Sequence, residues 1–104
     1  MKKRLRKKKH VGEFQELGFD LDGSLRPGMA REALHAFSDR FIAHIEAQQL
    51  AFGGGIGPTV GGFVTRFGRG SATEEDRASV TSFLASDPDI LKHVIGELRD
   101  AWYP

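Results

Sequence analysis

Cysteine is absent from the 104-residue sequence, and this absence excludes several classes of chemistry. Without thiols the chain has no disulfide framework, no cysteine nucleophile and no cysteine-ligated zinc or iron–sulfur centre. Long apolar runs are also missing, and none approaches the ~18 residues of a membrane-spanning helix. The basic start of the chain is followed by polar residues, whereas a secretion signal continues with an apolar segment. We therefore expect a soluble, cytoplasmic protein with no membrane partner.

Patterns that bind metals or cofactors are equally scarce. Two of the four histidines, His35 and His44, lie nine residues apart on a predicted helix. That spacing is a rotation of about 900°, which places them on opposite faces. The other two, His10 and His93, lie near opposite ends of the chain. The glycine-rich segment 53–57 lacks the lysine and the following serine or threonine of a phosphate-binding loop. The sequence therefore predicts no metal, no cofactor and no small-molecule substrate.

Charge is plentiful but unevenly distributed. The chain has 15 basic and 14 acidic residues, yet seven of the basic ones lie within the first nine positions. The remainder carries 8 basic against 14 acidic residues, a net charge of −6. This division predicts a basic arm, residues 1–10, attached to a single acidic domain, residues 11–104. A short arm of like charges should stay flexible until it meets a polyanion.

The side chains of the arm are suited to nucleic-acid phosphates. Lysine and arginine neutralise phosphates and release condensed counterions, which gives affinity without reading a base sequence. Arginine also forks onto phosphates and stacks on bases. We expect the polyanion-binding residues to be Lys2, Lys3, Arg4, Arg6, Lys7, Lys8, Lys9 and His10. Charge alone leaves two alternatives open, which are a solubilising tail without a partner and a localisation signal.

The first half of the domain is predicted to form a strand and then a helix. Apolar and polar residues alternate over residues 13–25, which is typical of a half-buried strand. The strand should end at Arg26-Pro27-Gly28. A helix is predicted from Met29 to about Gln49, because one apolar stripe repeats there at helical spacing. The stripe comprises Leu34, Phe37, Phe41, Ile42 and Ile45.

The next segment is predicted to contain a hairpin and a second helix. Residues 50–67 should form two short strands, with the glycine-rich residues 53–59 as the turn between them. Aromatic side chains of the second strand, Phe63 and Phe67, are expected in the core. Thr73 is expected to cap a helix that ends at Asp87-Pro88-Asp89. The predicted buried stripe of this helix is Ala78, Val80, Phe83 and Leu84.

The last segment, residues 90–103, fits a helix by its periodicity and a strand by its alternation. With a terminal strand the element order is βαββαβ, which is a ferredoxin-like two-layer sandwich. That α+β fold has a four-stranded antiparallel sheet with two helices on one face. With a terminal helix the result is a three-stranded sheet with three helices. Both alternatives are two-layer α+β structures.

Residues 19–25, Phe-Asp-Leu-Asp-Gly-Ser-Leu, raise an enzymatic alternative. They resemble the F-D-x-D-G-T-L motif of haloacid-dehalogenase-type phosphatases, in which one aspartate attacks phosphorus and the next is the acid or base. Asp20 would then be the nucleophile and Asp22 the acid or base. That fold needs a buried parallel strand before the motif, whereas the residues here alternate and include Glu13 and Glu16. A strand end followed by a turn is the simpler interpretation.

Residues 4–19 read Arg-Leu-Arg-Lys-Lys-Lys-His-Val-Gly-Glu-Phe-Gln-Glu-Leu-Gly-Phe. This stretch closely resembles the start of the YggL family of small bacterial proteins, with its basic RRLRKK run, its histidine and its EFQELGF segment. Further similarities follow in order at residues 50–52 with the glycines after them, at residues 73–75 and at residues 98–102. The resemblance therefore spans nearly the whole chain.

The resemblance implies binding to the large (50S) ribosomal subunit without catalytic activity. It implies that the arm contacts ribosomal RNA phosphates, with ribosomal proteins as further contacts, and that residues 92–102 form a strand. The sequence-based hypothesis is thus a non-enzymatic, ribosome-associated protein that acts in ribosome assembly or translation. The alternatives are a haloacid-dehalogenase-like phosphatase that uses Asp20 and Asp22, and a plain protein-interaction domain.

Overall fold

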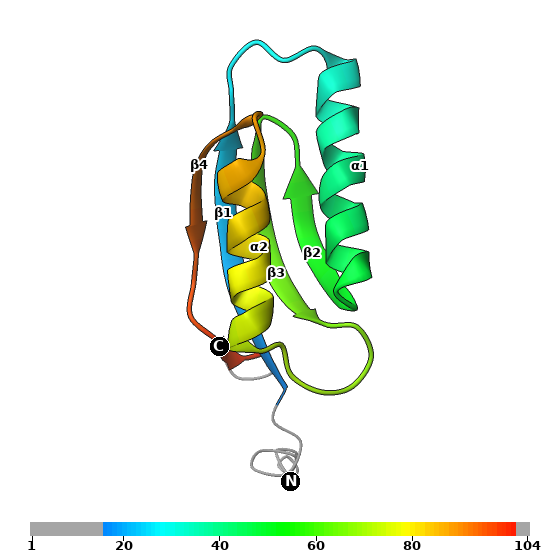
Figure 1. Ribbon diagram of the computed structural model, residues 1–104, viewed down its shortest axis with the longest axis vertical. Coiled ribbons are helices and arrows are strands. Elements are labelled where there is room, and N and C mark those ends of the chain that lie inside the picture. The colour runs from blue at the N-terminus through cyan, green and yellow to red at the C-terminus, as the bar shows by residue number, and fades with distance from the viewer. Residues whose placement is uncertain (1–15, 102–104) are drawn as a thin grey trace, which may run out of the picture.

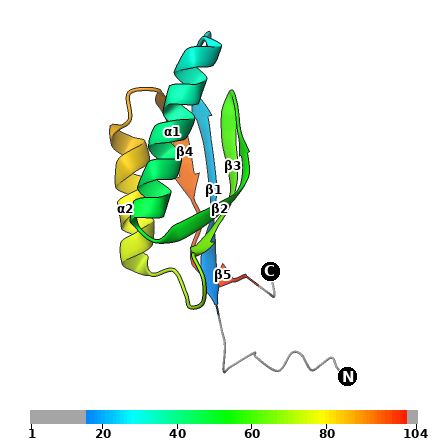
Figure 2. The ribbon, with the colours of Figure 1, turned by 90° about the vertical axis from the view of Figure 1, so that its right-hand side faces the viewer.

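A computed structural model describes residues 16–101 of the chain. Its elements in chain order are β1 (Leu17–Leu25), α1 (Arg31–Ala47), β2 (Leu50–Ile56), β3 (Thr59–Arg66), α2 (Glu74–Ser86), β4 (Ile90–Ile95) and β5 (Arg99–Asp100). The strands form one layer and the two helices form the other (Figure 1). Both helices cover the same face of the sheet, and the opposite face has no described helix over it (Figure 2). The predicted two-layer α+β arrangement is confirmed.

The sheet is antiparallel, with the order β2-β3-β1-β4 and with β5 paired to β1. The described residues therefore form a sheet of five strands, and the prediction of a four-stranded, ferredoxin-like sheet is wrong in its number of strands. The fifth strand arises because the last edge of the sheet is interrupted. After β4, Gly96 donates its N–H to the Asp20 carbonyl oxygen at 2.8 Å, and β5 then pairs with Leu17 and Gly18.

The ambiguous last segment is a strand wherever the structure assigns it regular secondary structure. Its residues pair with β1 at 90–95 and again at 99–100. The helix alternative for this segment is therefore wrong within the described residues. The helical periodicity arose because β4 carries apolar residues both toward the core and toward solvent: Ile90 and Ile95 pack against the core, whereas Leu91 and Val94 are exposed.

The centre of the sheet is β1, and its alternation separates the two faces. Phe19 and Leu21 are fully buried under the helices. Asp20 and Asp22 belong to the opposite, uncovered face, because successive side chains of a strand alternate. The predicted strand end is confirmed, since the turn at Pro27 and Gly28 follows soon after Leu25.

The apolar stripe predicted for α1 packs onto this sheet. Phe37, Phe41 and Ile45 are buried, and the remaining stripe residues are partly buried against the same core. The Phe41 ring meets the Phe52 ring of β2 edge-on, with 5.0 Å between their centroids. Such edge-to-face aromatic pairs add about 1 kcal/mol beyond their buried area. This contact stabilises the packing of α1 against β2.

α2 begins with the cap that the sequence predicts at Thr73. The Thr73 hydroxyl accepts a hydrogen bond from the Asp76 N–H at 3.1 Å, and the Asp76 carboxylate accepts one from the Thr73 N–H at 2.9 Å. These two bonds form a capping box. The buried face is carried by Val80 and Leu84, whereas Ala78 is exposed and its predicted burial is wrong. Ala78 lies about 200° around the helix from Val80.

The hairpin of β2 and β3 corrects the predicted role of the glycines. Residues 53–55 are not a turn, because they pair within the sheet with residues 61–63. The connection between the two strands is confined to Gly57–Pro58. Gly54 pairs with Gly62 so closely that a Cβ on Gly54 would lie 2.7 Å from the Gly62 Cα. The absence of side chains at this crossing permits the close approach of the two strands.

Candidate functional site

The predicted arm lies outside the described residues. It comprises Lys2, Lys3, Arg4, Arg6, Lys7, Lys8, Lys9 and His10, and its contacts stay a prediction. The structure does locate the point at which the described chain begins. The Ala101 N–H donates to the Glu16 carbonyl oxygen at 2.9 Å, so the two ends of the described chain lie side by side. Both are at one end of the molecule (Figure 1).

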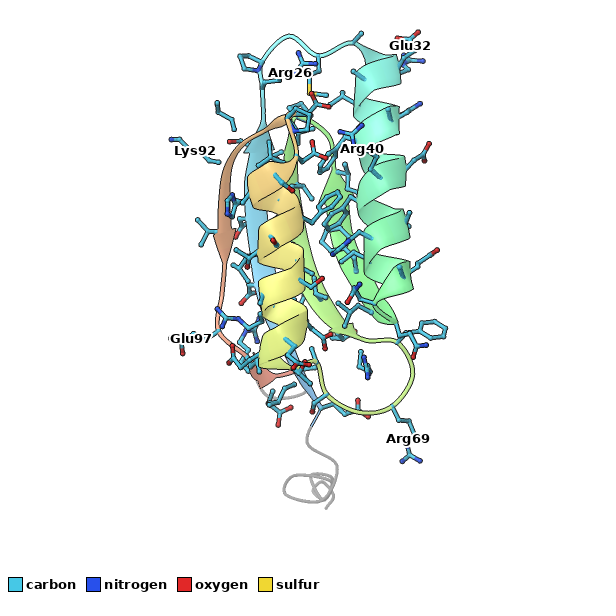
Figure 3. All side chains as sticks on the ribbon, in the orientation of Figure 1. Arg26, Glu32, Arg40, Arg69, Lys92 and Glu97 are labelled. Atoms are coloured by element: carbon cyan, nitrogen blue, oxygen red, sulfur yellow. The ribbon has the colours of Figure 1, made fainter. Side chains whose placement is uncertain are left out.

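Two arginines lie near this end of the molecule. Arg66 is the last residue of β3, and it lines a shallow hollow of about 240 Å³ together with Glu16 and Ala101. Arg69 is exposed in the loop that leads to α2, close to the point where the described chain begins (Figure 3). The surface beside the start of β1 therefore includes positive side chains, which suit an anionic partner.

Most basic side chains elsewhere on the domain are engaged by carboxylates. Of the six other lysines and arginines in residues 16–101, four form ion pairs, namely Arg26, Arg40, Arg77 and Arg99. Arg40 contacts Asp87 at 3.0 Å and Asp89 at 2.9 Å, and Arg26 contacts Asp89 at 2.7 Å. Hydrogen bonds from Arg26 and then Arg40 lower the pKa of Asp89. This cluster joins β1 and α1 to the α2–β4 connection and leaves little positive charge for a polyanion.

The uncovered face of the sheet carries a charged pair beside an aromatic ring. Arg99 of β5 donates two hydrogen bonds to the Asp20 carboxylate, at 2.9 and 3.1 Å. The same guanidinium lies 4.5 Å from the centroid of the Phe63 ring. A Cβ on Gly18 would overlap the Phe63 ring, so the glycine makes room for it. Phe63 therefore lies half-buried, beneath Arg99, on the face of the sheet that no described helix covers. Its predicted burial in the core is wrong.

This pair also bears on the phosphatase alternative. The hydrogen bonds from Arg99 lower the pKa of Asp20 and occupy both of its oxygens. The strand that carries Asp20 and Asp22 is antiparallel to all its neighbours, whereas the phosphatase motif follows a parallel strand of a doubly wound sheet. In the part of the chain that the structure describes, no three His, Cys, Asp or Glu residues gather as metal ligands. The motif therefore lies on a face of an antiparallel sheet, a context that differs from that of the phosphatase motif.

A groove lies where α1 runs beside β2, and we call it the edge groove. Its volume of about 640 Å³ is within the usual range of binding clefts. Its lining residues are Ile42, Ile45, Glu46, Gln49, Leu50, Ala51, Phe52 and Phe67. Phe67 is 72% exposed, so its predicted burial is wrong. Alternation would place Phe67 with Phe63 on the uncovered face and not in the core. Phe67 instead follows the last residue of β3, Arg66, and lines the edge groove.

Sequence reasoning missed both the Asp20–Arg99 pair and the edge groove. The two partners of the pair are 79 positions apart, so no local pattern connects them. A signal for the exposure of Phe67 was present, because two glycines, Gly68 and Gly70, follow it closely and indicate that the strand ends there. Neither helix in residues 16–101 combines the length and the apolar character needed to cross a membrane.

Comparisons with known proteins agree with the resemblance. The family model described as YggL 50S ribosome-binding protein matches residues 3–103. A protein of Haemophilus influenzae, described as uncharacterized, is 34% identical over 101 residues, which cover 96% of this chain and 88% of that protein. No solved structure matches significantly. The match covers nearly all of the sequence, and the chain belongs to the YggL 50S ribosome-binding protein family.

Proposed function

We propose that this protein is a non-enzymatic accessory factor of the large ribosomal subunit and that its basic arm contacts ribosomal RNA phosphates. Membership of the 50S-binding family carries this proposal. The family match begins at residue 3, so it includes six of the seven lysines and arginines of the arm. A cytoplasmic location and a role in ribosome assembly or translation follow from such a partner.

The division of charge supports an arm-centred mechanism. Residues 16–101 carry 8 basic and 13 acidic residues, a net charge of −5. Bulk RNA repels such a domain, so RNA contact should be confined to the arm and to the end of the molecule near Arg66 and Arg69. The arm supplies phosphate contacts, and the acidic domain prevents indiscriminate binding along RNA.

Co-sedimentation with large subunits through a sucrose gradient tests this mechanism. The full chain should travel with the subunits at low salt, and a variant without residues 2–9 should remain near the top. Seven arm cations that each displace one counterion give a log–log salt slope of at most about −6. The measured slope should become much shallower when the arm is removed.

Two arm variants separate charge from length. Replacing all seven lysines and arginines by glutamine keeps the length and should abolish co-sedimentation as the deletion does. Exchanging each arginine for lysine and each lysine for arginine keeps the charge and should preserve most of the binding. Equal co-sedimentation of the truncated and full chains would refute the arm-centred mechanism. It would favour the alternative of a plain protein-interaction domain.

A further inference from the structure

The free edge of β2 lacks the features that normally protect such an edge. Within residues 16–101, β2 pairs only with β3, so its other side is an edge of the described sheet. Natural edge strands usually carry lysine, proline or a bulge that prevents further strand pairing. β2 reads Leu-Ala-Phe-Gly-Gly-Gly-Ile and pairs in unbroken register over seven residues. The opposite edge, β4, differs because it contains Lys92 and is bordered by a register shift at Leu25.

Two hydrogen bonds at the ends of the hairpin show which backbone groups of β2 point away from β3. The Gln49 carbonyl oxygen accepts from the Phe67 N–H at 2.9 Å, and the Gly57 N–H donates to the Thr59 carbonyl oxygen at 2.8 Å. Both Gln49 and Gly57 therefore face β3. Because strand residues alternate in direction, the odd-numbered residues between them face β3 as well. The outward N–H and C=O groups belong to Leu50, Phe52, Gly54 and Ile56.

The edge groove lies directly beside these outward groups. Leu50 and Phe52 belong both to the free edge and to the lining of the groove. Ile42 of α1 and the exposed Phe67 provide apolar surface on either side. A strand added to β2 would therefore gain backbone hydrogen bonds and could place alternate side chains in an apolar groove. This combination is the usual basis of peptide recognition by strand addition.

Charge indicates which extended segment fits. Glu46 lines the groove, and Glu32 and Asp39 precede it at intervals of seven residues on α1. Intervals of seven place all three carboxylates along one side of the helix. All three are exposed. A second copy of this chain is a poor occupant, because pairing of two β2 edges would bring together two grooves that each carry Glu46. A segment rich in lysine and arginine is complementary.

We infer that the edge groove binds an extended, basic segment of a ribosomal protein, which adds as a strand to β2. Its apolar side chains lie on Ile42, Phe52 and Phe67, and its basic side chains lie beside Glu46. The choice of a ribosomal protein as the source rests on the proposed function. The molecule would thus use two contacts, the arm on RNA and the groove on protein, which raises avidity through effective concentration.

A synthetic peptide of alternating valine and lysine, capped at both ends, is a suitable probe. Titration into isotope-labelled protein should shift the amide NMR signals of β2 and of the last two turns of α1. Phe67→Ala should weaken binding about fivefold, because it removes an exposed apolar wall. Leu91→Ala is the matched control, since Leu91 is 62% exposed on the opposite edge and its replacement should leave the affinity unchanged.

A second pair of variants tests the charge. Glu46→Arg should weaken peptide binding about fivefold or more. Glu75→Arg makes the same change of charge on an exposed residue of α2 and should have little effect. A matching peptide of alternating valine and glutamate should bind far more weakly than the basic one to the unmodified protein.

Four results would overturn the inference. The first is no saturation at about 1 mM peptide, and the second is signal shifts centred on the uncovered sheet face. The third is a dimer in sedimentation equilibrium that Phe67→Ala dissociates, which would make a second copy the occupant. The fourth is binding of a short RNA oligonucleotide at β2. The peptide titration contains no ribosome, so it tests the groove even if the protein fails to co-sediment with large subunits. Likewise, arm-dependent co-sedimentation can still be measured if the peptide does not bind.

Discussion

Replacing Gly54 by alanine should destabilise the protein far more than the same change at its neighbour Gly53. A Cβ on Gly54 would overlap the Gly61 carbonyl oxygen and lie 2.7 Å from the Gly62 Cα. A Cβ on Gly53 would meet no atom within 4 Å. Both glycines are exposed and both belong to β2. The difference between them is therefore the space available between the strands and not burial.

The magnitude follows from the ladder on either side of Gly54. Making room for the methyl group requires β2 and β3 to separate locally, which weakens the hydrogen-bonded pairs formed by Gly53 with Phe63 and by Gly55 with Gly61. Each pair holds two bonds of about 1 kcal/mol net, so a loss of about 2–4 kcal/mol is expected. For a domain of this size that loss lowers the melting temperature by about 10–25 °C. Gly53→Ala should instead be neutral or stabilise by about 0.5 kcal/mol.

Urea unfolding followed by far-ultraviolet circular dichroism measures both variants against the unmodified protein. A Gly54→Ala variant within about 0.5 kcal/mol of the unmodified protein would show that the strands have room for a methyl group. Equal losses at Gly53 and Gly54 would show that glycine flexibility matters here and that the close crossing does not. Either result would refute the reasoning from strand spacing.

Two further predictions concern the helix cap and the ion-pair cluster. Thr73→Ala removes the capping box of α2 and should lower the free energy of unfolding, measured in urea, by about 1–2 kcal/mol. Thr73→Ser keeps the hydroxyl and should retain most of the stability. An alanine variant with unchanged stability would show that the cap is dispensable. The pKa of Asp89 is lower in the folded state, so Asp89 contributes stability above its unfolded pKa near 3.8, and this contribution disappears as the pH falls through the folded pKa. Urea midpoints of the unmodified protein should therefore exceed those of Asp89→Asn near neutral pH and converge as the pH falls below 3.8 and through the folded pKa. A gap independent of pH would contradict the ion-pair origin.

Local patterns in the sequence predicted the helices well. The apolar stripe of α1 and the cap at Thr73 depend on spacings within one or two turns, which the chain itself contains. Alternation likewise predicted β1, because one of its faces is buried. Local patterns failed where residues of other elements decide the outcome. The glycines of β2 have no side chains to show a period, so only their pairing with β3 reveals a strand.

The candidate site divides in the same way. The basic run was evident from charge alone, and the family signature indicated binding to the 50S subunit, whereas contact between the two stays a prediction. The partners of Asp20 were not predictable, because Arg99 reaches it from a strand at the other end of the chain. Phe67 was expected in the core together with Phe63, and only the pairing of β3 with β1 reveals that Phe63 belongs to the uncovered face.

The sequence by itself determined a basic arm on an acidic domain, the amphipathic elements of that domain and its membership of a 50S-binding family. These properties reside in composition and in short-range order, so they need no knowledge of which strand lies beside which. Only the tertiary structure decided that β2 is an edge strand and that α1 lies alongside it (Figure 1). The groove between them is lined mainly by apolar residues together with Glu46. Such a surface arises from the long-range pairing of strands, which residue spacing does not specify.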